Sequence, residues 1–182
     1  ILSVLRKSSN YAAVIVELAR DRKQTKSFIN KIRKICLKKG IILIFDECTS
    51  GFRETFGGLH LNFGINPDIA TFGKALGNGY SICSILGNKE IMQQAQNTFA
   101  SSTFWTDRIG PSAGLKTLEI MRKLKSWEII STQGKKIKKS FKKISLDTKV
   151  PLKITGLDAL PKFYFNKKHN IYKTFVSQEF LK

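Results

Sequence analysis

The chain has 182 residues, which is enough for one domain with a substantial hydrophobic core. It carries 32 Lys and Arg against 13 Asp and Glu, a formal net charge of +19, yet 42% of its residues are hydrophobic. That apolar content excludes a disordered polybasic tail, and no apolar run approaches the roughly 18 residues that a membrane-spanning helix needs.

The first part of the chain alternates strand, helix and strand. Residues 11–18 form a short β-branched apolar run that is typical of a buried strand. Residues 26–39 follow as a helix, with lysines in the last turn and Gly40 in the capping position. The expected inner face of this helix holds Phe28, Ile32, Ile35 and Cys36. Residues 41–45 form a second buried strand, and a strand-helix-strand unit predicts a parallel sheet in an α/β fold.

The pattern continues with further strands over 68–72 and 81–86 and helices over 89–97 and 111–124. The last of these helices is expected to turn Ala113, Thr117, Leu118, Met121 and Leu124 inward. Beyond Ser126 the composition becomes that of a lysine-rich helix followed by short strands near 152–155 and 162–165. We therefore expect two domains, over 1–125 and 126–182.

The positive charge is unevenly distributed. Residues 51–110 hold four basic and four acidic side chains, so the excess lies on both sides of a neutral middle. Such a charge attracts nucleic acid, and a basic nucleic-acid-binding domain is one possible function. Many lysines fall within helical patterns, however, as in residues 134–143, where Ile137, Phe141 and Ile144 mark an apolar stripe. A solvated helix face explains these lysines without a ligand.

The cysteines and histidines favour neither disulfides nor zinc. Cys36, Cys48 and Cys83 are widely spaced, and each lies in an apolar stretch where a buried free thiol is the commoner state. His60 and His169 are the only imidazoles, too few and too far apart for a structural zinc site. These features predict a soluble protein from a reducing compartment.

Two residues with side chains that could take part in catalysis follow predicted strands. Asp46 comes after the second strand and Lys74 after the third, and in α/β sheets ligands bind beyond the carboxyl ends of strands. Lys74 lies among Gly73, Gly77 and Gly79. Partial burial there would lower the pKa of the amine from about 10.4 and make it a nucleophile for a carbonyl. Glycine-flanked lysines also contact phosphates, and an aspartate after a strand is often a helix cap, so spacing alone leaves these roles open.

Four motifs that follow one another along the chain make this interpretation more specific. They are LIFDECTSGFR at 43–53, Gly57-Gly58, PDIATFGKALGNGY at 67–80 and Ser-Thr-Phe at 102–104. These motifs resemble those of the class III aminotransferases, pyridoxal-phosphate enzymes of fold type I that include the glutamate-1-semialdehyde aminomutases. The similarity extends over nearly the whole chain, although the amino-terminal half of the family and the end of its small domain are absent. The resemblance implies the later part of the cofactor-binding large domain over 1–125, with a mostly parallel sheet flanked by helices, and a partial α+β small domain over 126–182.

The resemblance also implies roles for individual residues. Lys74 would form the Schiff base with pyridoxal 5'-phosphate, and Asp46 would face the pyridine nitrogen, raise its pKa and keep it protonated. Thr103 would bind the cofactor phosphate across the subunit boundary of a homodimer. Cys48 stands where the family has a valine packed on the cofactor ring, and Thr49 stands where many members carry a glutamine near the ring oxygen.

The implied function is that of a cytoplasmic transaminase that moves an amino group from an amine or amino acid donor to a carbonyl acceptor. The alternative within the family is a 2,1-aminomutase. The run Ser-Thr-Phe-Trp-Thr at 102–106 differs from the Gly-Thr-Leu-Ser-Gly pattern of the aminomutases, which favours the transaminase. A truncated paralogue that no longer binds cofactor and a nucleic-acid-binding domain stay open as further alternatives.

Overall fold

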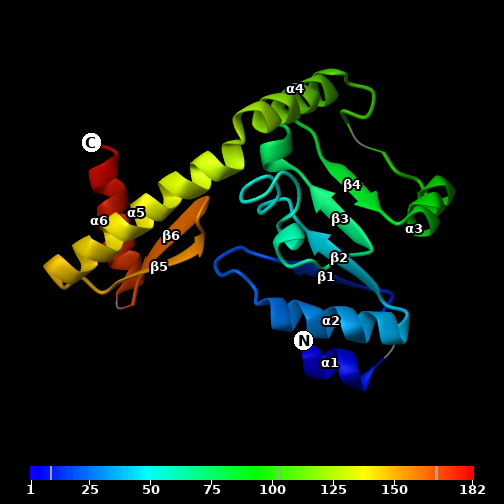
Figure 1. The fold of residues 1–182 in the computed structure, drawn as a ribbon, viewed down its shortest axis with the longest axis horizontal. Helices are drawn as coiled ribbons and strands as arrows, with labels where there is room; N and C mark the ends of the chain where they lie inside the picture. The colour runs from blue at the N-terminus through cyan, green and yellow to red at the C-terminus, as the bar shows by residue number, and fades with distance from the viewer. Residues whose placement is uncertain (9, 102, 167) are drawn as a thin grey trace.

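The computed structural model describes residues 1–8, 10–101, 103–166 and 168–182. The chain forms a four-stranded sheet with flanking helices, followed by a two-stranded hairpin between two further helices (Figure 1). Among the helices of these residues, none combines the length and the apolar character needed to cross a membrane. The architecture is α/β, as the strand-helix-strand pattern predicts.

The sheet carries the residues of interest at its strand ends. Its strands are β1 (Ala13–Glu17), β2 (Ile42–Asp46), β3 (Ile69–Phe72) and β4 (Ser84–Gly87), in that spatial order. The pairs β1–β2 and β2–β3 are parallel, whereas β4 is antiparallel to β3. The expectation of a mostly parallel sheet flanked by helices is confirmed, and β4 is its antiparallel exception because the connection between β3 and β4 is too short to contain a crossover helix. The sheet is mostly parallel.

Helix α2 (Lys26–Lys39) covers one side of the sheet, and its boundaries match the prediction. The Thr25 hydroxyl accepts a hydrogen bond from the Phe28 backbone N–H at the first turn. Gly40 ends the helix in the left-handed conformation, with φ +65°. The buried face holds Ile29, Ile32 and Cys36, while Phe28 and Ile35 are only half-buried. The short helix α1 (Leu2–Lys7), which no pattern predicts, packs beside α2 (Figure 1).

The hydrophobic core lies between α2 and strands β1 and β2. It is built from buried side chains that include Val14, Val16, Ile29, Ile32, Leu43 and Phe45. A second, smaller cluster of Ala70, Phe72 and Leu76 packs against Phe52, Ile82 and Leu118. The 3-10 helices Leu59–Asn62 and Lys74–Leu76 follow β2 and β3. Through Leu118, the second cluster joins the end of β3 to helix α4 (Ile109–Leu124).

Helix α4 (Ile109–Leu124) follows α3 (Lys89–Gln93) and a 3-10 helix over Gln94–Asn97. Of the five residues expected to face inward, Leu124 is 54% exposed, so that expectation is wrong. The other four, Ala113, Thr117, Leu118 and Met121, are half-buried. The chain turns at Lys125, where φ is +48°, and the next helix begins at Ser126 directly after this turn.

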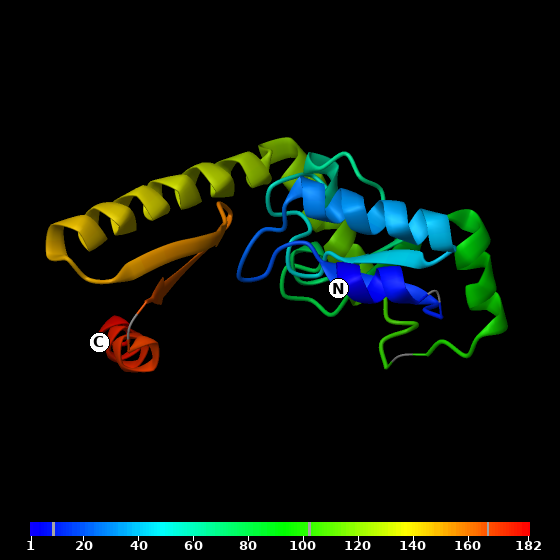
Figure 2. The ribbon, with the colours of Figure 1, turned by 90° about the horizontal axis from the view of Figure 1, so that it is seen from below.

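Helix α5 (Ser126–Thr148) extends away from the sheet, the remaining two strands pack along it, and the last helix packs on the second of these strands (Figures 1 and 2). These elements are β5 (Leu152–Leu157), the antiparallel β6 (Leu160–Phe165) and α6 (His169–Phe180). The predicted apolar stripe of α5 is partly wrong. Ile137 and Ile144 are about half exposed, whereas Phe141 stacks on Phe163 of β6. The buried face of α5 is centred on Gly134, because a residue without a side chain lets the turn at Asp158 approach the helix.

Candidate functional site

Asp46 is held at the shared end of β2 and β3. It is the last residue of β2 and pairs in register with Thr71 of β3. Its Oδ1 accepts a hydrogen bond of 3.0 Å from the Cys48 backbone N–H and one of 3.3 Å from the Thr71 hydroxyl. The second oxygen, Oδ2, takes no part in these two bonds. These two hydrogen bonds, made at the ends of β2 and β3, therefore fix the orientation of the Asp46 carboxylate.

The surroundings of Asp46 keep it ionised. Partial burial alone would raise the pKa of this carboxyl group. Hydrogen bonds from Cys48 and Thr71, together with the positive charge of Lys74, outweigh burial and bring the pKa below its ordinary value. Asp46 is therefore an anion at neutral pH.

Lys74 follows β3 at the same edge of the sheet. Its φ is +44°, a left-handed conformation that a residue with a side chain adopts only under constraint. Its Nζ donates a hydrogen bond of 2.9 Å to the Thr49 hydroxyl, so the two loops that follow β2 and β3 meet at this lysine. The predicted partial burial of Lys74 is wrong, because its side chain is exposed. The 3-10 turn over Lys74–Leu76 lifts the lysine off the sheet as soon as the strand ends.

Cys48 and Cys83 flank Gly73, the residue before the lysine. A Cβ placed on Gly73 would lie 3.3 Å from the Cys83 sulfur and 3.6 Å from the Cys48 sulfur. Cys48 is half-buried, and this burial is the main reason that the pKa of its thiol is raised. Cys36, Cys48 and Cys83 are free thiols, but only Cys36 is buried. The expectation of burial is wrong for Cys83, which lies just before β4 at the exposed end of the sheet.

Thr103 lies apart from this group. It is exposed in the turn over residues 103–106, and within the described part of the chain it makes no hydrogen bond to Asp46 or Lys74. Ser102, which belongs to the same motif, lies outside the described residues. The structure thus brings together Asp46, Cys48 and Lys74 but not Thr103.

A buried, hydrogen-bonded carboxylate next to Asp46 was not predicted from the sequence. Glu47 is fully buried, and its carboxylate accepts hydrogen bonds from the Ser50 hydroxyl and from the backbone N–H and Nδ1 of His60, the last two at 2.9 Å. Burial would raise the pKa of Glu47, but the bonds from His60 and Ser50 reverse this effect and leave the pKa lowered. The sequence held one signal for the burial of Glu47. Successive side chains of a strand lie on opposite faces of the sheet, so the residue after Asp46 points away from the face that Asp46 occupies. Glu47 ties the loop after β2 to the sheet.

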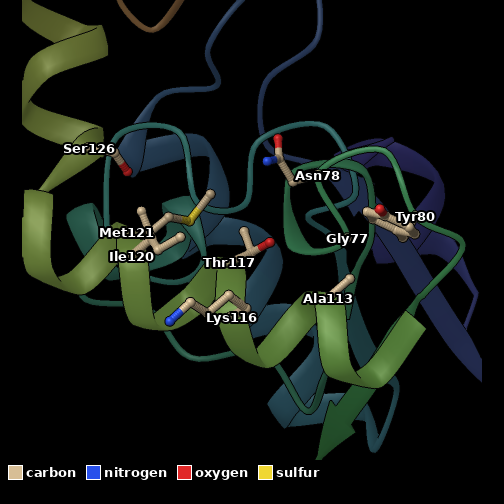
Figure 3. Close-up of a pocket in the computed structure, with 9 residues that line it drawn as sticks. All are labelled: Gly77, Asn78, Tyr80, Ala113, Lys116, Thr117, Ile120, Met121 and Ser126. Carbon is tan, nitrogen blue, oxygen red and sulfur yellow. The ribbon is translucent and has the colours of Figure 1, made fainter. Parts of the chain in front are cut away.

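Two open-sided cavities lie beside Lys74 and helix α4. The first, of about 400 Å³, is formed by α4 side chains such as Thr117 and Met121 and by the loop over Gly77–Tyr80 (Figure 3). The second, of about 420 Å³, is lined by Lys74 and Arg53 and shares Asn78, Met121 and Ser126 with the first. Asp46 and Thr103 line neither of these two cavities. Lys74 is therefore the candidate residue that both contacts the strand-end cluster and lines one of the cavities.

Comparison with known proteins decides the family. The family model described as "Aminotransferase class-III" matches residues 2–179. The chain belongs to the class III aminotransferases. Among curated members, the 3-aminobutyryl-CoA aminotransferase of Cloacimonas acidaminovorans is 36% identical over 80% of this chain. The glutamate-1-semialdehyde 2,1-aminomutase of Sulfurihydrogenibium sp. strain YO3AOP1 is 31% identical over 79% of it.

Solved structures agree with this membership. The FumI protein of Sphingopyxis sp. MTA144, solved in its pyridoxal-phosphate internal aldimine form, superposes with a TM-score of 0.84 at 26% identity, covering 91% of this class III chain and 41% of that one. A transaminase with bound pyridoxal phosphate superposes with a TM-score of 0.85 at 21% identity, which supports the fold alone. The matches cover 36% and 34% of the two curated relatives, so the chain spans little more than a third of their length.

Proposed function

We propose that this chain is part of a pyridoxal-phosphate-dependent aminotransferase that moves an amino group from an amine or amino acid to a carbonyl acceptor. The observation that carries the proposal is the placement of Lys74 and Asp46 at one sheet edge in a chain of this family. Lys74 would hold the cofactor through a Schiff base at its Nζ. Gly73 supports this role, because a side chain there would fill the space between Cys48 and Cys83 beside Asp46.

The bound cofactor supplies an electron-accepting ring that stabilises negative charge on the substrate carbon. Asp46, ionised and fixed by Cys48 and Thr71, would pair with the protonated ring nitrogen and keep the proton there. Lys74 Nζ, when it no longer holds the cofactor, would remove the proton from the substrate carbon, carry it as an ammonium group and then pass it to a second carbon. The Thr49 hydroxyl orients this amine, since it accepts its hydrogen bond. Cys48 would pack against the ring.

Three further assignments belong to the same proposal. Thr103 would bind the cofactor phosphate of the partner subunit in a homodimer, a role that suits an exposed hydroxyl remote from Lys74. The protein would act in the cytoplasm. The chain would divide at Lys125 into a part of the large domain over 1–125 and a part of the small domain over 126–182, and the change of direction between α4 and α5 supports this boundary.

Covalent trapping tests the proposal. The full-length protein is incubated with pyridoxal phosphate, reduced with borohydride and digested, and the labelled peptide is identified by mass spectrometry. We expect one label on Lys74 that is absent from Lys74→Ala and unchanged in Lys89→Ala, which removes another exposed lysine. Label spread over surface lysines in the wild type would refute the assignment.

A 2,1-aminomutase is the second candidate, because several curated relatives at 28–33% identity carry that name. An aminomutase uses the same lysine but returns the amino group to a neighbouring carbon of the same molecule. Incubation with glutamate 1-semialdehyde in the absence of any other amino acceptor distinguishes the two. Transfer within this substrate would establish the aminomutase, whereas turnover that needs a separate acceptor would establish the transaminase.

A further inference from the structure

Two free thiols meet beside Gly73, the residue that precedes Lys74. Cys48 lies in the loop after β2 and Cys83 directly precedes β4, so the two cysteines approach Gly73 from opposite sides of β3. A Cβ on Gly73 would lie 3.3 Å from the Cys83 sulfur and 3.6 Å from the Cys48 sulfur. Because Gly73 has no side chain, both sulfurs border the same small space.

The two thiols differ in their access to solvent. Cys83 is exposed, so a small oxidant in solution reaches its sulfur directly. Cys48 is half-buried, and burial is the main cause of the raised pKa of its thiol. Cys48 is therefore protected from direct oxidation but lies beside the sulfur that is oxidised first. An accessible thiol next to a second, resolving thiol is the usual arrangement of a redox-sensing cysteine pair.

The segment that carries Cys83 has few contacts that would prevent it from moving toward Cys48. A disulfide requires the two Cβ atoms to lie about 3.8 Å apart, so a bond across Gly73 needs a shift of the backbone. Strand β4 is at the edge of the sheet, where its one neighbour is β3. Outside the helices and strands, residues 81–83 take no part in the backbone hydrogen bonds of the described chain. The segment before β4 is therefore the part that would move.

Cys48 is linked to Asp46 in two ways. Its backbone N–H donates a hydrogen bond of 3.0 Å to Asp46 Oδ1. Its thiol donates to the Thr71 hydroxyl at 3.8 Å, and this hydroxyl donates to the same Asp46 oxygen at 3.3 Å. A covalent bond to Cys83 would remove the thiol proton and draw the Cys48 sulfur away from Thr71. Oxidation of Cys48 would thus change the hydrogen bonds that orient Asp46.

We propose that hydrogen peroxide converts Cys48 and Cys83 into a reversible disulfide, and that this disulfide weakens cofactor binding at Asp46 and Lys74. In the first step the Cys83 sulfur takes one oxygen from the peroxide, whose O–O bond breaks, and a sulfenic acid and water form. The Cys48 sulfur then attacks the Cys83 sulfur, and the sulfenic hydroxyl leaves with the Cys48 proton as a second water. The two thiols lose two electrons and two protons, and the peroxide is reduced to two molecules of water.

The effect on the cofactor rests on the proposed function, whereas the disulfide itself does not. The disulfide would occupy the space beside Gly73, next to the lysine that would hold the cofactor. In a reducing compartment, which the sequence predicts, disulfides are usually transient and often serve in redox sensing. A dithiol reductant would cleave the bond and restore the contact between Cys48 and Thr71.

Peptide mapping tests for the disulfide. The full-length protein is treated with hydrogen peroxide, its remaining thiols are blocked with iodoacetamide, and its peptides are identified by mass spectrometry without reduction. We expect a cross-linked Cys48–Cys83 peptide that disappears with dithiothreitol. Cys83→Ser should lack this peptide, whereas Cys36→Ala, which changes the buried cysteine, should form it as wild type does. Gly73→Ala should form about threefold less, because the added methyl group lies between the two sulfurs.

Equilibrium dialysis tests the effect on the cofactor site. The cofactor-free protein is oxidised with peroxide and then dialysed against pyridoxal phosphate. We expect about tenfold weaker retention than in the reduced protein, with recovery after dithiothreitol. Cys83→Ser should retain the cofactor equally well before and after peroxide. Its melting temperature, expected within a few degrees of wild type, shows that the fold is intact, and Cys83→Ala repeats the measurement with a second side chain.

Four results would overturn the inference. One is the absence of the cross-linked peptide from peroxide-treated wild type, whether Cys83 stays reduced or is trapped by dimedone as a sulfenic acid. A second is a cross-link between the Cys83 residues of two molecules, seen as a reducible dimer on a gel. A third is a Cys48–Cys83 disulfide with unchanged cofactor retention. The last is equal loss of retention in wild type and Cys83→Ser, which would assign the oxidation to another residue.

Borohydride labelling of the reduced protein separates this inference from the proposed function. Failure of reduced wild type to take the label on Lys74 would refute the aminotransferase, while the cross-linked peptide would still establish the thiol pair. A labelled Lys74 in a protein that forms no Cys48–Cys83 disulfide would leave the proposed function standing and refute this inference.

Discussion

Asp46 and Glu47 are adjacent carboxylates with opposite surroundings. Asp46 points toward the exposed strand end, where Lys74 contributes to its lowered pKa, whereas Glu47 points into the protein and is satisfied by Ser50 and His60. Strand alternation produces this separation, because successive side chains lie on opposite faces. One carboxylate is therefore available for chemistry, and the other holds the loop that carries Cys48 and Thr49.

Replacement of Glu47 tests this structural role. Glu47→Gln should lower the free energy of unfolding at pH 7 by about 2 kcal/mol, the usual scale for hydrogen bonds to a buried charge. Because the pKa of Glu47 is lowered on folding, its stabilising contribution is complete above the unfolded pKa of about 4.3 and is lost as the pH falls through the folded value. Urea unfolding between pH 7 and pH 3 should therefore depend less on pH in Glu47→Gln than in wild type. The exposed Glu90→Gln is the control, and an unchanged pH dependence in Glu47→Gln would contradict the prediction.

The contact between Lys74 and Thr49 gives a second residue-level prediction. Thr49→Val removes the acceptor of the 2.9 Å bond while keeping the shape of the side chain. Because one exposed hydrogen bond contributes about 1 kcal/mol, we expect roughly fivefold weaker retention of pyridoxal phosphate, measured by equilibrium dialysis. Thr49→Ser keeps the hydroxyl and should retain the cofactor as wild type does. Equal retention by the valine and serine variants would rule out a role for the hydroxyl.

At the scale of elements, two glycines have different purposes. Gly40 ends α2 at φ +65°, and a Cβ there would have no neighbour within 4 Å. Gly134 sits inside α5, where a Cβ would overlap the carbonyl oxygen of Asp158 in the turn between β5 and β6. The first glycine is needed for its backbone conformation, and the second is needed for the close approach of a hairpin to a helix.

Alanine substitutions distinguish these two purposes. Gly40→Ala should cost about 1 kcal/mol because only the left-handed conformation is penalised. Gly134→Ala gains helix propensity of about 1 kcal/mol but forces the hairpin off the helix, so we expect a net loss of about 1–3 kcal/mol. Urea unfolding measures both losses. A Gly134→Ala variant more stable than wild type would show that the hairpin does not pack on α5 in this way.

At the scale of the whole molecule, α5 and the hairpin connect to the sheet through few polar contacts. Glu54 joins Lys23 near β1 to the Asp158 backbone N–H in the hairpin turn. Lys162 of β6 also pairs with Asp21 at 2.8 Å, but the Asp21 side chain is 80% exposed and such pairs contribute little. Glu54, whose side chain is only 12% exposed, therefore makes the less exposed of these two links, a hydrogen bond that its carboxylate accepts from the hairpin turn.

Hydrogen exchange tests the role of Glu54. Glu54→Ala removes the acceptor of the Asp158 amide, and we expect this amide to exchange about 10- to 150-fold faster, since a bond to a charged group contributes about 1.5–3 kcal/mol. Asp21→Asn should leave the exchange rate unchanged. Equal protection of the Asp158 amide in wild type and Glu54→Ala, measured by NMR, would contradict the link.

The charge of the molecule also belongs to this scale. Lysines 135, 136, 139, 142 and 143 of α5 are exposed, as a solvated helix face requires. If the protein instead binds nucleic acid, its affinity for nucleic acid should fall steeply as the salt concentration rises. Filter binding at two salt concentrations decides between these interpretations.

The sequence by itself determined the order of the elements and the two residues at the strand ends. Hydrophobic periodicity and capping are local properties, so α2 with Gly40 and the positions of Asp46 and Lys74 could be predicted from neighbours along the chain. The motifs around Lys74 also indicated the family that the comparison established.

Only the tertiary structure decided which distant groups meet. The direction of β4, the bond from Lys74 to Thr49 and the buried bonds of Glu47 join residues that are separate in the sequence. The same holds for the cavity shared by Arg53 and Lys74 and for the face of α5 that meets the hairpin. The physical reason is that side-chain burial and unpaired charge depend on packing between elements, which periodicity along one element does not specify.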